Sequence, residues 1–190
     1  MANDSYRNGA VNEGRFAAWA ISKGSSVIQV AQGQNWAPRL ATWASDVGPC
    51  WDGGRKIVLP DLQVHHRTEG LCWVEVKGKS TAVEYRHAHE MRTGIDRRLL
   101  VHYRRIEQLT GYPVRIVFCH ERENDVRWVR VAEREIRGVG NGSEMSYWAW
   151  DSMPRLCSLD ELSQCSPAVN LWNDEPLFGP AVNHVQQALW

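Results

Sequence analysis

The chain has 190 residues, with 22 basic and 22 acidic side chains and a formal net charge of zero at pH 7. This length suits one domain with a sizeable hydrophobic core. Its five cysteines form no CxxC pair, which disfavours a disulfide scaffold, and no apolar run approaches the roughly eighteen residues that span a membrane. Because the first thirty residues also lack a signal-peptide pattern, we expect a cytoplasmic protein with reduced thiols and no membrane partner.

The zero net charge conceals an uneven distribution along the chain. Residues 1–75 hold 7 basic and 7 acidic side chains, residues 76–137 hold 14 and 9, and residues 138–190 hold 1 and 6. Proteins that bind nucleic acid concentrate basic side chains on one surface. The middle segment is therefore the candidate for such a surface, and an ordinary solvated face is the alternative.

The first half of the chain predicts one helix followed by strands. Small and apolar residues at helical spacing predict a helix over 10–22, which ends at Gly24. A β-branched run predicts a strand over 25–31, and the Gly, Pro, Asn and Asp residues of 32–55 indicate a long loop or an inserted turn of helix. Two further strands, 56–66 and 71–77, are expected to form a hairpin about a four-residue turn that contains Gly70.

The second half predicts a helix and then strands. Apolar residues at helical spacing, closed by Gly111 and Pro113, predict a helix over 94–111. Strands are expected over 113–121, 126–135 and 145–151, a helix over 158–165 and an extended tail over 167–184. The sequence thus predicts an α/β domain, a mixed β-sheet flanked by helices, over residues 1–153, with a C-terminal helix and tail over 154–190.

The two strands of the expected hairpin each carry acidic side chains on one face. Side chains alternate along a strand, so Asp61 lies opposite the face of Leu62, and Glu75 and Lys77 share the face opposite Val76. Because neighbouring strands lie about 4.8 Å apart, both carboxylates can reach one hard cation, for which magnesium or manganese is the natural choice.

Bound magnesium would suit phosphodiester hydrolysis, which needs an activated water and a counter-charge for the phosphorane. Lys77 would orient or deprotonate that water. A lysine that is desolvated beside a metal can have a lowered pKa, which would make the role of base possible. Glu13, on a helix with a face of small alanines, would complete the metal shell.

The spacing Pro60-Asp61, thirteen residues, Glu75-Val76-Lys77 resembles the PD-(D/E)XK motif of restriction-endonuclease-like and archaeal Holliday-junction-resolvase-like nucleases. The resemblance implies a restriction-endonuclease-like core over residues 10–121. It also implies metal ligation by Asp61, Glu75 and the carbonyl of Val76, with Glu13 as the helical acid and Lys77 assisting the water. Some members carry Gln and Tyr on the later helix; here Tyr103 is present, but Arg98 stands near the place expected for Gln.

We therefore interpret the chain as a metal-dependent nuclease, an endonuclease that acts on DNA and works as a two-fold dimer when it cuts both strands. Its short length is similar to that of stand-alone phage or mobile-element nucleases. Five basic residues are candidate contacts to the DNA backbone: Lys79, Arg97, Arg98, Arg104 and Arg105. A catalytically inactive nucleic-acid-binding or assembly protein of the same fold is the alternative, and a small protein-interaction domain is a third possibility.

Other patterns indicate less. Gly78-Lys79-Ser80 resembles the end of a phosphate-binding loop, but Trp73 stands where that loop needs glycine. The segment 85–89 holds two histidines and is interpreted as a solvated loop, and His65-His66 as surface residues. Trp148 and Trp150 are expected in the core.

Overall fold

A computed structural model describes residues 3–30, 51–52, 55–85, 89–140 and 142–165. Most of the loop predicted over 32–55, and the tail predicted over 167–184, lie outside these residues. Within the described part, no helix is both long enough and apolar enough to cross a bilayer.

The main sheet has six strands in the order β1-β4-β5-β8-β9-β12. Its pairs are antiparallel except for β5 and β8, which run parallel, so the sheet is mixed as the sequence predicted. The strands are β1 (Ser26–Gln29), β4 (Leu62–His66), β5 (Gly70–Lys79), β8 (Val114–His120), β9 (Asp125–Arg130) and β12 (Arg155–Cys157).

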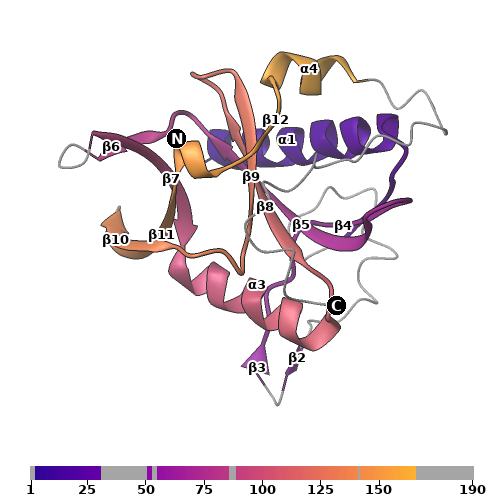
Figure 1. Cartoon of the computed structure of the whole chain (residues 1–190), viewed down its shortest axis with the longest axis horizontal. Coiled ribbons are helices and arrows are strands. Elements are labelled where there is room, and N and C mark those ends of the chain that lie inside the picture. The colour runs from indigo at the N-terminus through magenta and orange to yellow at the C-terminus, as the bar shows by residue number, and fades with distance from the viewer. Residues whose placement is uncertain (1–2, 31–50, 53–54, 86–88, 141, 166–190) are drawn as a thin grey trace.

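Helices cover both faces of this sheet. Helix α1 (Asn3–Ser22) and the short helix α4 (Leu159–Gln164) lie on one side of it, and α3 (Arg97–Thr110) lies on the other (Figure 1). Because α3 lies between the parallel strands in sequence, it forms part of the crossover that a parallel pair requires. The predicted mixed α/β fold with flanking helices is confirmed.

A second sheet of four strands, in the order β10-β11-β7-β6, stands beside the main one. Its strands are β6 (Val83–Tyr85), β7 (Glu90–Asp96), β10 (Ile136–Gly140) and β11 (Ser143–Ala149), and a 3-10 turn over Trp150–Ser152 follows. A two-stranded ladder joins β2 (Trp51–Asp52) to β3 (Arg55–Lys56). Strands β2, β6, β7, β10 and β12 were not predicted, because strands of two to seven residues with mixed polarity show little periodicity.

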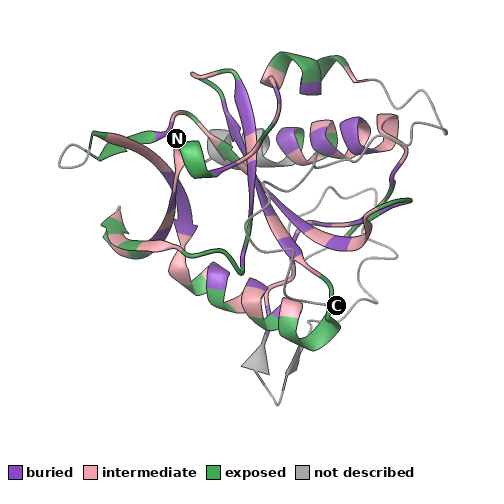
Figure 2. Cartoon of the chain, in the orientation of Figure 1, coloured by how far each residue is buried: buried purple, intermediate pink, exposed green. Residues whose placement is uncertain are grey.

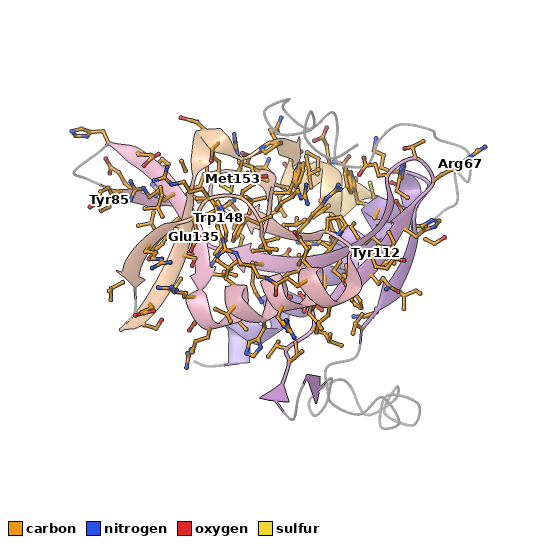
Figure 3. All side chains as sticks on the ribbon, turned by 60° about the horizontal axis from the view of Figure 1, so that its bottom comes forward. Arg67, Tyr85, Tyr112, Glu135, Trp148 and Met153 are labelled. Atoms are coloured by element: carbon orange, nitrogen blue, oxygen red, sulfur yellow. The ribbon has the colours of Figure 1, made fainter. Side chains whose placement is uncertain are left out.

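Two hydrophobic clusters fill the two sides of the main sheet, and Figure 2 shows the buried residues concentrated along β5, β8 and the inward face of α1. The first cluster joins Phe16 of α1 to Val76 and to Leu162 of α4. The second joins Tyr103 of α3 to Phe118 and Trp148. Trp148 lies within the packed interior in Figure 3, which confirms its predicted core position.

Helix α3 begins and ends at residues that its sequence provides. The side chain of Asp96 accepts a hydrogen bond from the backbone N–H of Arg98 at 2.8 Å, as an N-cap does. Gly111 adopts φ 72°, and its N–H returns to the carbonyl of Glu107, as an αL C-cap does. The helix starts three residues later than predicted, because Gly94 and Ile95 belong to β7.

Three other predicted features differ in the structure. Helix α1 begins at Asn3 rather than at residue 10, and residues 57–61 precede β4 instead of belonging to it. His66, expected at the surface, is 2% exposed, and its ring nitrogens contact the carbonyl of Lys23 and the hydroxyl and N–H of Thr68. These hydrogen bonds make the burial of its imidazole possible.

The predicted boundary after residue 153 does not coincide with a break in packing. Strand β12 pairs with β9 at the edge of the main sheet, and the side chains of Cys157 and Leu162 lie in the first cluster. The capping box of α4, in which Ser158 and Glu161 exchange hydrogen bonds, confirms the predicted helix there. Residues 155–164 therefore belong to the same core as the rest of the described chain.

Gly94 lies where β7 passes under Tyr147 of β11, and a Cβ there would meet Tyr147 Cδ1 at 2.8 Å and the carbonyl oxygen of Ser146 even more closely. We expect Gly94→Ala to destabilise the protein by about 1–3 kcal/mol, because backbone must move to relieve the overlap. Gly14→Ala is the matched control: no atom lies within 4 Å of the added Cβ, and alanine favours the helix by up to about 1 kcal/mol. Urea unfolding of both variants measures the difference, and equal stabilities would contradict the packing described.

Candidate metal and catalytic centre

Strand β5 carries the two candidate catalytic side chains into the middle of the molecule. Its parallel register pairs Glu75 with Ile116 and Lys77 with Phe118, and both partners belong to the second hydrophobic cluster. Glu75 is 2% exposed, whereas the Lys77 side chain is 31% exposed. The predicted alternation of β5 is confirmed, with Val76 buried in the first cluster.

Asp61 is held at the start of β4 by contacts with both neighbouring segments. Its carboxylate Oδ2 accepts a hydrogen bond from the backbone N–H of Val76 at 2.9 Å. Its carbonyl accepts another from the N–H of Val30 at 2.8 Å. Asp61 and the Glu75-Val76-Lys77 segment therefore meet directly in the fold, as the motif spacing suggested.

The carboxylate of Glu75 has one satisfied and one unsatisfied oxygen. Oε1 forms an ion pair with the ammonium of Lys77, and the hydroxyl of Tyr103 is hydrogen-bonded to the same carboxylate. Oε2 is buried and has no hydrogen-bond partner. A buried carboxylate oxygen without a partner is costly in a folded protein, which marks this position as a site for a further ligand.

Tyr103 thus fixes the Glu75 side chain from the α3 side. Burial, followed by the charge of Glu75 and the hydrogen bond to it, raises the pKa of the Tyr103 phenol, so the hydroxyl stays protonated and donates. The sequence placed Tyr103 on the helix by its spacing, and the structure shows which carboxylate it contacts.

Negative charge at the centre exceeds what Lys77 compensates. Burial and then the charge of Glu75 raise the pKa of Asp61 to about 8, and the same two causes raise the pKa of Glu13 on α1. The charges of Glu75 and Lys77 both act on the Glu13 carboxyl, so α1 places this residue near the centre. Because burial and Glu75 disfavour the ionised forms of Asp61 and Glu13, these two carboxyls require an additional cation to be fully charged.

Lys77 does not have the lowered pKa that the role of general base would need. Burial alone would lower the pKa of its ammonium, but the charges of Glu75 and Asp61, the hydrogen bond to Glu75 and the charge of Glu13 together raise it. Desolvation favours a lower pKa for Lys77, but the neighbouring carboxylates favour a higher one. In this structure Lys77 is therefore a cation rather than a base.

The oxygen donors and the negative charge of these residues suit a divalent metal ion. The unpartnered Oε2 of Glu75 and the mutual repulsion of Glu13, Asp61 and Glu75 both call for positive charge, and oxygen donors are those that magnesium and manganese prefer. Among the described residues, no three His, Cys, Asp or Glu side chains are yet arranged at metal-binding distance. The carboxylates would have to shift their rotamers as the ion binds.

The arginines predicted to contact DNA differ in their surroundings. Arg104 is engaged internally: its guanidinium donates to the carbonyl of Val131 at 2.8 Å and pairs with the carboxylate of Glu135. Arg98 pairs with Asp96, and Arg97 lies 3.4 Å from Glu144. The side chain of Arg105 is exposed and reaches Gln108. The contacts of Arg104 give it a structural role between α3 and the β9–β10 connection.

The site face of the sheet continues past Lys77 to a lysine and a histidine. Lys79 pairs in register with His120 of β8, so the two side chains stand beside each other on the face of Lys77. His120 is fully buried, and neither ring nitrogen has a partner at full hydrogen-bond geometry, although the backbone of Asp125 contacts the ring weakly. His120 was not predicted as a site residue. Its position as a polar residue at the end of the mainly apolar strand β8 was the available indication.

Comparison with known proteins finds distant structural likeness alone. No protein-family profile and no curated protein sequence match the chain. The structure of Archaeoglobus fulgidus Hjc, a Holliday junction resolvase from an archaeal hyperthermophile, aligns with 81% of this chain and 99% of its own at 13% identity and a TM-score of 0.49. D212, a nuclease from a fusselovirus, aligns over 80% and 81% of the two chains, at 11% identity and a TM-score of 0.36. Likenesses this distant do not indicate what the chain does.

The buried imidazole of His120 should make the stability of the fold depend on pH. Burial lowers its pKa to about 4. The charges of Glu123 and Asp125 and a weak contact with the backbone of Asp125 oppose this shift, and the charge of Lys79 adds to it. A histidine whose pKa is lower in the folded than in the unfolded chain stabilises the fold above the unfolded pKa, near 6.5, and this contribution is lost as pH falls toward 4.

We therefore expect the free energy of unfolding to fall between pH 6.5 and pH 4, by up to about 3 kcal/mol from this residue. His120→Leu should flatten this part of the profile, because leucine does not titrate. Urea unfolding at several pH values measures both slopes. Identical slopes for the two proteins would show that His120 is not the group responsible.

Proposed function

We propose that this protein is a metal-dependent nuclease that hydrolyses phosphodiester bonds in DNA at the centre formed by Asp61, Glu75 and Lys77. The observation that carries the proposal is the buried carboxylate of Glu75, which has one oxygen on Lys77 and the other without a partner, beside a second carboxylate on Asp61. Acids and a cation that converge in this way suit phosphoryl transfer.

Magnesium or manganese, when bound, would polarise the phosphate and lower the pKa of a water molecule. Asp61, Glu75 and the carbonyl of Val76 would hold the ion, and Glu13 would complete its shell from α1. The hydrogen bond from the Val76 N–H fixes the orientation of the Asp61 carboxylate. Tyr103 fixes that of Glu75, so it is a positioning residue.

Lys77 has three tasks in this proposal. Its ammonium holds Glu75 in place and offers positive charge to the non-bridging phosphate oxygens, on which charge accumulates in the transition state. A cation at this position also orients the attacking water through its N–H groups. For cleavage of both strands, we propose a two-fold dimer that presents two such centres.

The test is cleavage of supercoiled plasmid, linear duplex and branched DNA in the presence of magnesium or manganese. We expect wild-type cleavage to vanish with EDTA, and Glu75→Ala and Lys77→Ala each to lower the rate by about 100-fold or more. Glu84→Ala, which removes an exposed acid from β6, is the control and should cleave as the wild type does.

Two results would overturn the proposal. Cleavage that survives EDTA, or that Glu75→Ala retains, would show that the metal centre is not where the reaction occurs. A failure to cleave any of the three substrates, combined with metal-independent DNA binding, would favour the catalytically inactive nucleic-acid-binding protein instead.

A further inference from the structure

Lys79 is a half-buried cation to which the fold gives no counter-ion. Within the part of the chain that the structure describes, the ammonium of Lys79 forms no ion pair with a carboxylate. It lies over the ring of Phe118, with the ring centroid 6.0 Å away. Burial, and then the charge of Lys77, lower the pKa of Lys79. A desolvated ammonium without a partner is unfavourable, and it becomes favourable when an anion binds.

Several arginines of the described chain are placed differently. Each of three partly buried arginines forms an ion pair with a carboxylate. Arg92 pairs with Glu90, Arg115 with Glu69 and Arg127 with Asp125. The acidic residues Glu123 and Asp125 lie near His120, yet neither pairs with Lys79. The missing counter-ion at Lys79 is therefore a local feature of the site face.

His120 supplies an independent observation at the same position. Its imidazole is fully buried against Trp150, with ring centroids 4.6 Å apart. Neither ring nitrogen has a partner at full hydrogen-bond geometry, and the one polar group that acts weakly on the ring is the backbone of Asp125. A neutral imidazole carries one N–H donor, and leaving a buried donor unsatisfied costs about 1–3 kcal/mol. A donor and a cation that both lack partners, side by side at one register position, match the needs of a single phosphate group.

The distance from the metal centre fits a neighbouring phosphate. Lys77 and Lys79 are two residues apart on one face of β5, which is about 7 Å along the strand. An extended nucleic-acid strand that places one phosphate at Lys77 can place the next at Lys79. Strand β5 would then follow the nucleic-acid backbone, with its alternate side chains contacting successive phosphates.

We propose that Lys79 and His120 form a second phosphate-binding subsite, which holds the phosphate one nucleotide from the one that is cleaved. This inference rests on the proposed nuclease function, since it takes the substrate from it. Lys79 supplies charge at the mouth of the subsite, and the imidazole of His120 supplies a hydrogen bond after a small movement of the rings that cover it. The subsite fixes the position of the strand and contributes nothing to the chemical step.

Binding of a short fluorescein-labelled DNA duplex, measured by anisotropy in EDTA over a range of salt concentrations, tests the subsite without requiring cleavage. We expect Lys79→Ala to weaken binding by about tenfold and to reduce the slope of log affinity against log salt by about 1. Lys79→Arg should restore both. Arg134→Ala removes an exposed cation from the β9–β10 connection and is the matched control, with affinity and slope unchanged.

His120 is tested by a double-mutant cycle. His120→Leu alone should weaken binding by about threefold, and Lys79→Ala with His120→Leu should lose no more than Lys79→Ala alone, because both side chains act on one phosphate. Losses that multiply would overturn their joint action. Thermal unfolding of each variant excludes a general loss of structure.

The outcomes separate this inference from the proposed function. Unchanged affinity and salt slope in Lys79→Ala would overturn the subsite, even if the wild type cleaves DNA. A tenfold loss with the expected slope, in a protein that cleaves nothing, would support the subsite and overturn the nuclease. Where cleavage occurs, Lys79→Ala should raise KM by about tenfold with little effect on kcat, and a neutral methylphosphonate next to the mapped cut should weaken the wild type alone.

Discussion

The buried carboxylate of Glu75 is the constraint on which the rest of the centre depends. Strand β5 lies between β4 and β8 in the main sheet, so a side chain in its middle has little access to water. An ionised acid there needs compensation, and the fold provides part of it through Lys77 and Tyr103. Asp61 adds a second carboxyl, whose ionisation burial and Glu75 disfavour. Such an arrangement reduces the stability of the fold and prepares the site for a cation, as functional centres often do.

The sequence predicted those parts of the fold in which local signals agree with tertiary packing. Helix α3 has apolar spacing, an Asp N-cap and a glycine C-cap, and the β4–β5 turn has Gly70 at φ 76°. The second sheet was not predicted, because β6 and β10 are short and expose much of their surface. Such strands form through pairing with their neighbours and show little periodicity of their own. His66 was wrongly predicted at the surface, because one of the groups that hydrogen-bond its ring is the carbonyl of Lys23, which follows α1 and is distant in sequence.

For the centre, alternation along two strands was enough to bring Asp61, Glu75 and Lys77 together, because side-chain direction in a strand follows from position alone. The protonation of Lys77 could not be predicted in this way, since it depends on the balance between burial and three carboxylates, one of them on α1. Lys79 and His120 show the same limit: the β5–β8 register that pairs them joins residues 41 apart in the chain. Arg104 likewise appeared to be a surface cation until its partners near residues 131–135 were known.

Thermal unfolding of the wild type and of Asp61→Asn, with EDTA and with magnesium, tests the central claim that this cluster of acids is a metal site. In EDTA the variant should be more stable than the wild type, because asparagine removes a carboxyl whose ionised form burial and Glu75 disfavour. Magnesium should raise the Tm of the wild type, since a ligand that binds the folded state stabilises it, and should leave that of Asp61→Asn nearly unchanged. Asp151→Asn, at an exposed acid, should respond as the wild type does. Equal magnesium responses in wild type and Asp61→Asn, or none in either, would contradict the account.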